Sequence, residues 1–117
     1  MWSVGIYTGD SPFELKPVQG NPVLTKENVT DVRAEFVADP FMLQRDGRWH
    51  MFMEILNAET NHGEIGLATS DDGLDWTYQH VVLKEQFHLS YPYLFEWQND
   101  YYMVPETLDS GAVCLYK

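Results

Sequence analysis

Two glutamates of the sequence stand where acid–base chemistry is expected. Glu54 and Glu106 each follow a run of apolar strand residues, in "WHMFMEI" and "YYMVPET", and we expect both side chains on the same central side of the fold. A carboxyl group in a half-buried cavity has a raised pKa and can act as a general acid. A structural role is the alternative, in which each carboxylate accepts hydrogen bonds from a neighbouring strand or pairs with Arg33.

Asp39 and His88 are two further candidates. Asp39 begins the dipeptide Asp39-Pro40, and an aspartate at such a bend commonly accepts hydrogen bonds from nearby backbone groups. His88 precedes "SYPY" and suits an acid, a base or a donor to a sugar hydroxyl, with a purely structural role as the alternative.

Metal and phosphate chemistry are not indicated. The other histidines, His50, His62 and His80, show no ligand spacing, and there is no His/Cys cluster. The sequence contains neither a glycine-rich phosphate loop nor a nucleophile elbow. We therefore expect no metal and no cofactor.

Aromatic residues crowd the stretch "HLSYPYLFEWQNDYYMVPET". Tyr91, Tyr93, Phe95 and Trp97 alternate along one strand and are expected to share one face of it. Most of these rings are expected to pack in the core. One or two near the start of the strand, Tyr91 first among them, would stack on a sugar ring, because an aromatic face is apolar and its edge polar. Trp49, Arg33 and His88 complete the expected sugar-binding residues.

The elements that must position these residues are antiparallel strands. Period-two alternation and aromatic or β-branched runs dominate, and helical periodicity is absent, so the fold class is all-β. Asp46-Gly47 predicts a tight hairpin turn, and "DDGLDW" contains a second Asp-Gly turn. Four consecutive strands result, a meander from Pro40 to Leu83.

A second unit repeats the first at a constant offset of 52 residues. Asp39 aligns with Tyr91, the turn at 46–47 with 98–99, and Glu54 with Glu106. Four short antiparallel strands in a unit of about 50 residues are typical of a β-propeller blade. We predict one domain, 1–117, with blade-like units at 33–83 and 88–117. The second unit is one strand short, and the N-terminal strand, 2–9, would complete it in cis or in trans.

Charge and composition exclude several partners. The net charge is −11, which repels a nucleic-acid backbone and an anionic membrane surface. A single cysteine, Cys114, allows no intrachain disulfide. No signal peptide or membrane-spanning run is apparent, so we expect a cytoplasmic location.

The motifs "VADPF", "SDDGLDW", "FHLSYPY" and "YMVPET", with the opening "WSVGIYTGDSPFELKP" and "NPVL", resemble a known family. The family is the propeller domain at the N-terminal side of plant glucosamine inositolphosphorylceramide transferases, which is akin to the five-bladed propellers of family-43 glycoside hydrolases. The resemblance covers essentially the whole chain and implies about the first two blades. It also implies either a fragment of a longer propeller or, as we favour, a homo-oligomer joined through exposed strand edges.

The resemblance to the hydrolases implies that Asp39 corresponds to their catalytic base. In the second unit the hydrolases carry another aspartate, whereas this chain has Ser90 and Tyr91, and the general acid of the hydrolases belongs to a third blade. Three functions therefore stay open: a carbohydrate-associated module that binds sugar or forms part of a glycan-active assembly, a non-catalytic oligomeric β protein, and a glycosidase whose site is assembled across subunits.

Overall fold

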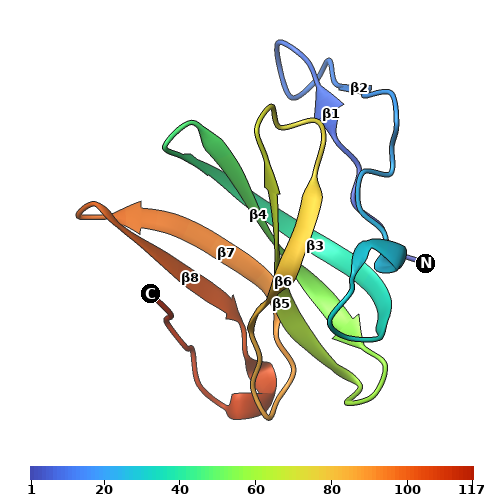
Figure 1. The fold of residues 1–117 in the computed structure, drawn as a ribbon. Helices are drawn as coiled ribbons and strands as arrows, with labels where there is room; N and C mark the ends of the chain where they lie inside the picture. The colour runs from blue at the N-terminus through green and yellow to red at the C-terminus, as the bar shows by residue number, and fades with distance from the viewer.

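The computed structural model describes residues 1–117 and confirms an all-β, antiparallel fold (Figure 1). Its elements, in chain order, are β1 (Tyr7–Thr8), β2 (Lys16–Pro17), η1 (Lys26–Asn28), β3 (Ala34–Arg45), β4 (Arg48–Asn57), β5 (His62–Ser70), β6 (Thr77–Leu83), β7 (Ser90–Trp97), β8 (Asp100–Glu106) and η2 (Leu108–Ser110). No helix is long and apolar enough to cross a membrane.

The first unit is a four-stranded sheet in the order β3-β4-β5-β6, as the meander predicts. Asp46 and Gly47 connect β3 to β4 with φ of 52° and 78°, so the Asp-Gly dipeptide supplies the two positive φ angles of a tight hairpin. The bend expected at Asp39-Pro40 does not end the strand. It is instead a register shift between Ala38 and Phe41 inside one continuous strand.

Successive side chains of β4 point to opposite faces of this sheet, and an apolar cluster covers each face. Met51, Met53 and Ile55 are buried on one face with Val4, Ile6 and Leu24 of the N-terminal segment. Phe52 packs on the other face, in the cluster formed around Ile65, Leu89 and Met103. In Figure 1 the N-terminal segment, in blue, and the β7–β8 hairpin, in orange to red, accordingly lie on different sides of the sheet.

The N-terminal strand expected at 2–9 does not complete the second unit in cis, so this part of the prediction is wrong. Only Tyr7–Thr8 form a strand, paired with Lys16–Pro17, while Val4 bridges Leu24. The physical reason is that Val4 and Ile6 alternate toward the first sheet and bury their side chains against its β4 face, far from the edge of β8.

The second unit consists of the β7–β8 hairpin, whose turn at Gln98 and Asn99 has φ of 52° and 66°. At the end of the predicted unit 88–117, the segment "AVCLYK" forms no strand and pairs only through a single bridge between Met103 and Tyr116. After β8 the chain turns through η2 and the left-handed Gly111 (φ 70°). It therefore does not return beside β8 as a regular strand.

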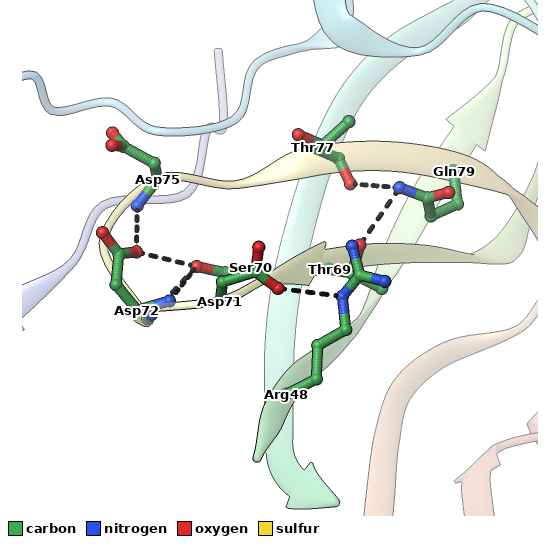
Figure 2. A network of polar contacts seen from close by, with 9 residues as sticks. Arg48, Thr69, Ser70, Asp71, Asp72, Asp75, Thr77 and Gln79 are labelled. Carbon is green, nitrogen blue, oxygen red and sulfur yellow. Dashed lines mark hydrogen bonds and ion pairs between the residues drawn. The ribbon is translucent and has the colours of Figure 1, made fainter. Parts of the chain in front are cut away.

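The segment "SDDGLDW" forms a hydrogen-bonded turn between β5 and β6 (Figure 2). The Asp72 carboxylate accepts the backbone N–H groups of Leu74 and Asp75 and the Ser70 hydroxyl. The Ser70 hydroxyl oxygen accepts the N–H of Gly73 at 2.8 Å. Trp76, at the end of the segment, is buried in the core. All of these bonds lie within the turn, and its role is therefore structural.

Candidate functional site

Two matching bulges position the site. In the first unit Ala38 pairs with Glu54, and the register then shifts so that Asp39 takes a left-handed backbone at φ 50°. In the second unit Ser90 pairs with Glu106, and Tyr91 takes φ 47°. Because each bulge lies directly opposite a glutamate, it turns the side chain at 39 or 91 out of the regular alternation beside that glutamate.

Glu54 is the most unusual group of the molecule. Its side chain is only 7% exposed, and its carboxyl group makes no hydrogen bond within the chain. Burial, together with the negative charges of Asp39 and Glu106, raises the pKa of the Glu54 carboxyl to about 7. The structure thus places Asp39 and Glu106, the two other predicted carboxylates, close enough to Glu54 to raise its pKa.

His88 links the two units at this site. Its Nδ1 accepts the backbone N–H of Gly63 at 2.9 Å, and its Nε2 lies 3.4 Å from Oε1 of Glu54. Because Nδ1 is occupied by the Gly63 N–H, Nε2 is the ring nitrogen that faces Glu54. His88 therefore connects β5 of the first unit to the glutamate of β4.

Glu106 combines a structural and a site role. Its Oε2 accepts the Ser90 hydroxyl at 3.1 Å, and its Oε1 accepts the backbone N–H of Leu108. Its side chain nevertheless stays exposed and lines a surface depression of about 490 Å³ with Thr107, Leu108 and Val113 among others. The alternative predicted for this residue, hydrogen bonding to a neighbouring strand, is thus present together with access to solvent.

Aromatic rings flank the carboxylates. Phe41, from β3, contacts Tyr91 and Tyr93 edge to face, with ring centroids 4.7 and 5.9 Å apart. The prediction that most aromatics of β7 are core residues is wrong, since Tyr91, Tyr93 and Trp97 are 56%, 51% and 61% exposed. The alternate residues Pro92 and Leu94 pack against the first unit instead, so the tyrosines face outward and their rings are free to bind a ligand.

Two predicted binding residues lie elsewhere. Trp49 belongs to the opposite face of β4, where its indole lies against Gly73 of the "SDDGLDW" turn. Arg33 is exposed and makes no ion pair with either glutamate. The period-two alternation of β4 explains the position of Trp49, because Trp49 and Glu54 differ by an odd number of positions along the strand and so point to opposite faces.

The sequence reasoning missed Gly63. A Cβ at this position would lie 2.1 Å from the Leu89 carbonyl oxygen and 3.0 Å from Oε1 of Glu54, so only glycine allows the two units to approach this closely. The only signal in the sequence was a glycine at the start of a strand, which by itself indicates close backbone approach without naming the partner.

Carboxylates beside exposed tyrosine rings suit a polar ligand with an apolar face. Glu54, Asp39 and Glu106 can accept hydrogen bonds from hydroxyl or amine groups, while Tyr91 and Tyr93 offer ring faces and edges. No group of three or more His, Cys, Asp and Glu side chains is arranged to hold a metal ion.

Known proteins with similar sequences cover the whole chain. Residues 1–117 match the family model described as "Glucosamine inositolphosphorylceramide transferase 1, N-terminal". Proteins named glucosamine inositolphosphorylceramide transferase 1 from Oryza sativa subsp. indica and Arabidopsis thaliana are each 35% identical over 133 residues. These alignments cover 99% of this chain but 18% of the rice relative and 17% of the Arabidopsis relative. The chain therefore spans less than a fifth of the length of these relatives.

A solved structure shows a similar fold. It is a mutant of the Bombyx mori GH32 β-fructofuranosidase in complex with sucrose, matched with a TM-score of 0.62 at 19% sequence identity. The match covers 78% of this chain and 19% of that one. At this identity the likeness concerns the fold alone, and it agrees with units that resemble propeller blades.

Proposed function

Because this chain belongs to the family of the N-terminal domain of glucosamine inositolphosphorylceramide transferase 1, we propose that it is a carbohydrate-binding, propeller-like module. The observation that carries this proposal is the place where the two units meet. There Glu54, almost fully buried and without a hydrogen bond, lies near Asp39 and Glu106, and the strained bulge that follows Ser90 holds the exposed ring of Tyr91. Carboxylates and exposed aromatic rings are the groups that hold sugars.

The names of similar proteins support a carbohydrate ligand in general terms. The relatives are named glucosamine inositolphosphorylceramide transferase 1, a name that contains an amino sugar, and the structural neighbour was solved with sucrose. The relatives are more than five times as long as this chain, so we propose sugar binding for this segment, without assigning the transfer reaction to it.

The carboxylates of this chain favour sugar binding without hydrolysis. An inverting glycosidase needs a base and an acid on opposite sides of the scissile bond, about 6.5–9.5 Å apart. Asp39 and Glu54 are chemically suited to these roles, but the equivalent of Asp39 in the second unit is Tyr91. A glycosidase assembled across subunits would require carboxylates from a second copy, and Asp39→Asn would then abolish the hydrolysis.

The exposed face of β7–β8 favours a second candidate, a non-catalytic oligomer. Tyr93 and Trp97 on this hairpin and Val113 and Leu115 after it are more than half exposed, which is typical of surfaces that bind another protein. The mass of the chain in solution, measured at several concentrations, tests this candidate. A monomer at every concentration would contradict it and would leave the carbohydrate proposal unaffected.

The test of the main proposal is a sugar-binding experiment with the purified chain. Amide resonances are followed by NMR while neutral and amino sugars are added, and a glycan array extends the search to oligosaccharides. We expect saturable shifts at Gly63, Leu89 and Tyr91 in the wild type and their loss in Tyr91→Ala. Absence of any saturable shift with every sugar would contradict the proposal.

A further inference from the structure

A second buried carboxylate, Glu64 of β5, lies on the opposite face of the first sheet from the proposed sugar site. It pairs with Ile55 of β4, and residues directly opposite each other on neighbouring strands point to the same face. That face also carries Tyr78 and Val81 of β6, which pack against the apolar cluster to which Ile55 belongs. The sheet therefore separates Glu64 from Glu54, and the two glutamates belong to different regions of the molecule.

One oxygen of the Glu64 carboxylate has no partner in the chain. The residue is only 5% exposed. Its Oε1 accepts a hydrogen bond from Nδ2 of Asn57 at 2.9 Å, whereas its Oε2 is buried and makes no hydrogen bond. A buried carboxylate oxygen without a donor is costly, and buried polar atoms in native structures are rarely left unpaired. The unpaired oxygen of Glu64 points to a donor from outside the chain.

Glu64 borders a surface depression of about 290 Å³, formed by the end of β6 and the segment that precedes β3. Asp31, in that segment, supplies a second carboxylate, and the apolar lining comes from Val32 and from residues 81–83. The terminal torsion of a glutamate is broad, so a small rotation of the carboxyl group presents Oε2 to this depression. The depression thus combines two carboxylates with apolar side chains.

The Asp31 carboxylate is fixed in position by two hydrogen bonds. Its Oδ1 accepts the Tyr78 hydroxyl at 2.6 Å, and its Oδ2 accepts the backbone N–H of Val81 at 2.7 Å. Burial acts to raise the pKa of Asp31, but these hydrogen bonds outweigh it and hold the pKa below its usual value. Because β6 is an edge strand and Asp31 already occupies the Val81 N–H, a partner reaches this site with a side chain rather than as an added strand.

No cation of the chain neutralises these two carboxylates. Lys84 is exposed and lines the same depression, yet it forms no ion pair with Asp31 or Glu64. No third carboxylate or histidine is placed to complete a metal site with them. The net charge of −11 attracts positively charged partners over the whole surface. An organic cation with an apolar portion therefore fits the depression.

We propose that this depression receives an arginine side chain from a basic segment of a partner protein, with Glu64 and Asp31 as the counter-charges. A guanidinium group carries N–H donors on both edges of a plane, and each Asp31 oxygen keeps a further lone pair, so one guanidinium can donate to both carboxylates. It is more weakly hydrated than an ammonium group, which suits a half-buried site. Its aliphatic stem packs against Val82 and Leu83. This interaction is independent of sugar binding at the junction of the two units.

The experiment titrates the full chain with small probes and follows its amide resonances by NMR. The probes are the Nα-acetyl methylamides of arginine, lysine and citrulline, the last of which has the shape of arginine without its charge, and a capped Gly-Ser-Arg-Ser-Gly peptide. We expect saturable shifts at Glu64, Val81 and Leu83 with the arginine amide, with a dissociation constant of about 1–10 mM. The lysine amide should bind at least about threefold more weakly, and the citrulline amide should not saturate. The peptide should bind at least as tightly as the arginine amide.

Variants assign the effect to the depression. Glu64→Gln keeps the shape of the side chain and an acceptor for Asn57 but removes the charge, so we expect the affinity for the arginine amide to fall about fivefold or more. Lys84→Gln removes the cation beside the depression at an exposed position and should raise this affinity about twofold. Glu35→Gln, an exposed carboxylate of β3 outside the depression, is the control and should leave the affinity unchanged.

Each part of the proposal has its own contradicting result. Equal binding of the citrulline amide would overturn recognition by charge, and equal binding of the lysine amide would overturn the choice of a guanidinium. Binding of the arginine amide without binding of the peptide would overturn a protein segment as its source. An unchanged affinity in Glu64→Gln would overturn the assignment to this depression. If that variant does not fold, an unchanged affinity in Lys84→Gln would do the same.

Discussion

Asp39 and Tyr91 lie 52 residues apart and adopt the same left-handed backbone, with φ of 50° and 47°. Each precedes a proline, and each interrupts the register of its strand directly beside a glutamate, Glu54 or Glu106. A left-handed backbone is acceptable for aspartate and strained for a tyrosine. The second unit therefore keeps the geometry of the bulge while presenting an aromatic ring in place of a carboxylate.

This strain gives a prediction that compares two tyrosines. Tyr91→Gly loses the ring contact with Phe41, which destabilises the protein by about 1 kcal/mol. It also removes the strain of the left-handed backbone, which stabilises the protein by about 1 kcal/mol. The unfolding free energy of this variant should therefore stay near that of the wild type. Tyr93→Gly loses a similar contact at a similarly exposed position, but it also introduces glycine into a regular strand. We expect Tyr93→Gly to be less stable than Tyr91→Gly by about 1–2 kcal/mol in urea denaturation. Equal stabilities would show that φ at Tyr91 is not strained.

The raised pKa of Glu54 predicts how stability depends on pH. The folded state holds the proton up to about pH 7, whereas the unfolded chain releases it near 4.5. Stability contributed by this group is complete below about pH 4.5 and is lost as pH rises to about 7, with an upper limit of about 3 kcal/mol. Chemical denaturation of the wild type and of Glu54→Gln from pH 4 to 9 measures this pH-dependent contribution to the unfolding free energy.

Glu54→Gln should flatten this decrease, because glutamine does not titrate. Other acidic groups of the chain also repel one another as pH rises, so the exposed Glu35→Gln serves as the control and should retain the slope of the wild type. Parallel curves for the wild type and Glu54→Gln would contradict a protonated Glu54 in the folded state.

Gly63→Ala tests the contact between the two units. Its methyl group would lie 2.1 Å from the Leu89 carbonyl oxygen and 2.9 Å from Cε1 of His88, so the β7–β8 hairpin must move away. We expect a loss of at least about 2 kcal/mol of stability and displaced His88 resonances in NMR spectra. Gly5→Ala is the control, since its nearest neighbours, atoms of the Asn21 side chain, lie at 3.4 Å. A fully stable Gly63→Ala protein would show that the units approach less closely than described.

Ser70→Ala tests the turn that "SDDGLDW" forms. The buried Ser70 hydroxyl accepts the N–H groups of Gly73 and Asp72, and its removal leaves these donors without a partner. We expect a loss of about 1–2 kcal/mol in the unfolding free energy. Thr77→Ala removes an exposed side chain of the same network whose hydroxyl makes no hydrogen bond (Figure 2), and should change stability by less than about 0.5 kcal/mol.

Met53→Ala tests the assignment of the two faces of β4. Met53 is fully buried between the first sheet and the N-terminal segment, whereas Met42, on the neighbouring strand, is 50% exposed. Truncation of Met53 should cost about 2–5 kcal/mol and that of Met42 less than about 1 kcal/mol. Similar losses from both, measured by chemical denaturation, would contradict the burial pattern on which the faces of the sheet are assigned.

The strands and the tight turns could be predicted from the sequence because their signals are local. Asp46-Gly47 fixes its hairpin by backbone conformation alone, and the alternation of Met51, Phe52 and Met53 fixes the faces of β4. The same alternation, applied strictly to β4, would have removed Trp49 from the predicted site.

Other features depend on packing between distant segments. Nothing local at Val4 or Ile6 shows that they bury against the first sheet rather than pair with β8. The exposure of Tyr91 and Tyr93 follows from which face of β7 meets the first unit, and Pro92 and Leu94 decide that through contacts far apart in sequence. The orientation of the His88 ring depends on a hydrogen bond from the Gly63 N–H, 25 residues away, which no sequence motif indicates.

The most direct test of the account is the binding of sugars to the wild type and to Tyr91→Ala, followed residue by residue in NMR spectra. The account predicts saturable shifts that are confined to the junction of the two units, at Gly63, Leu89 and Tyr91, with at least a severalfold weaker response in Tyr91→Ala. The absence of saturable shifts, or shifts confined to the N-terminal segment and the "SDDGLDW" turn, would contradict it.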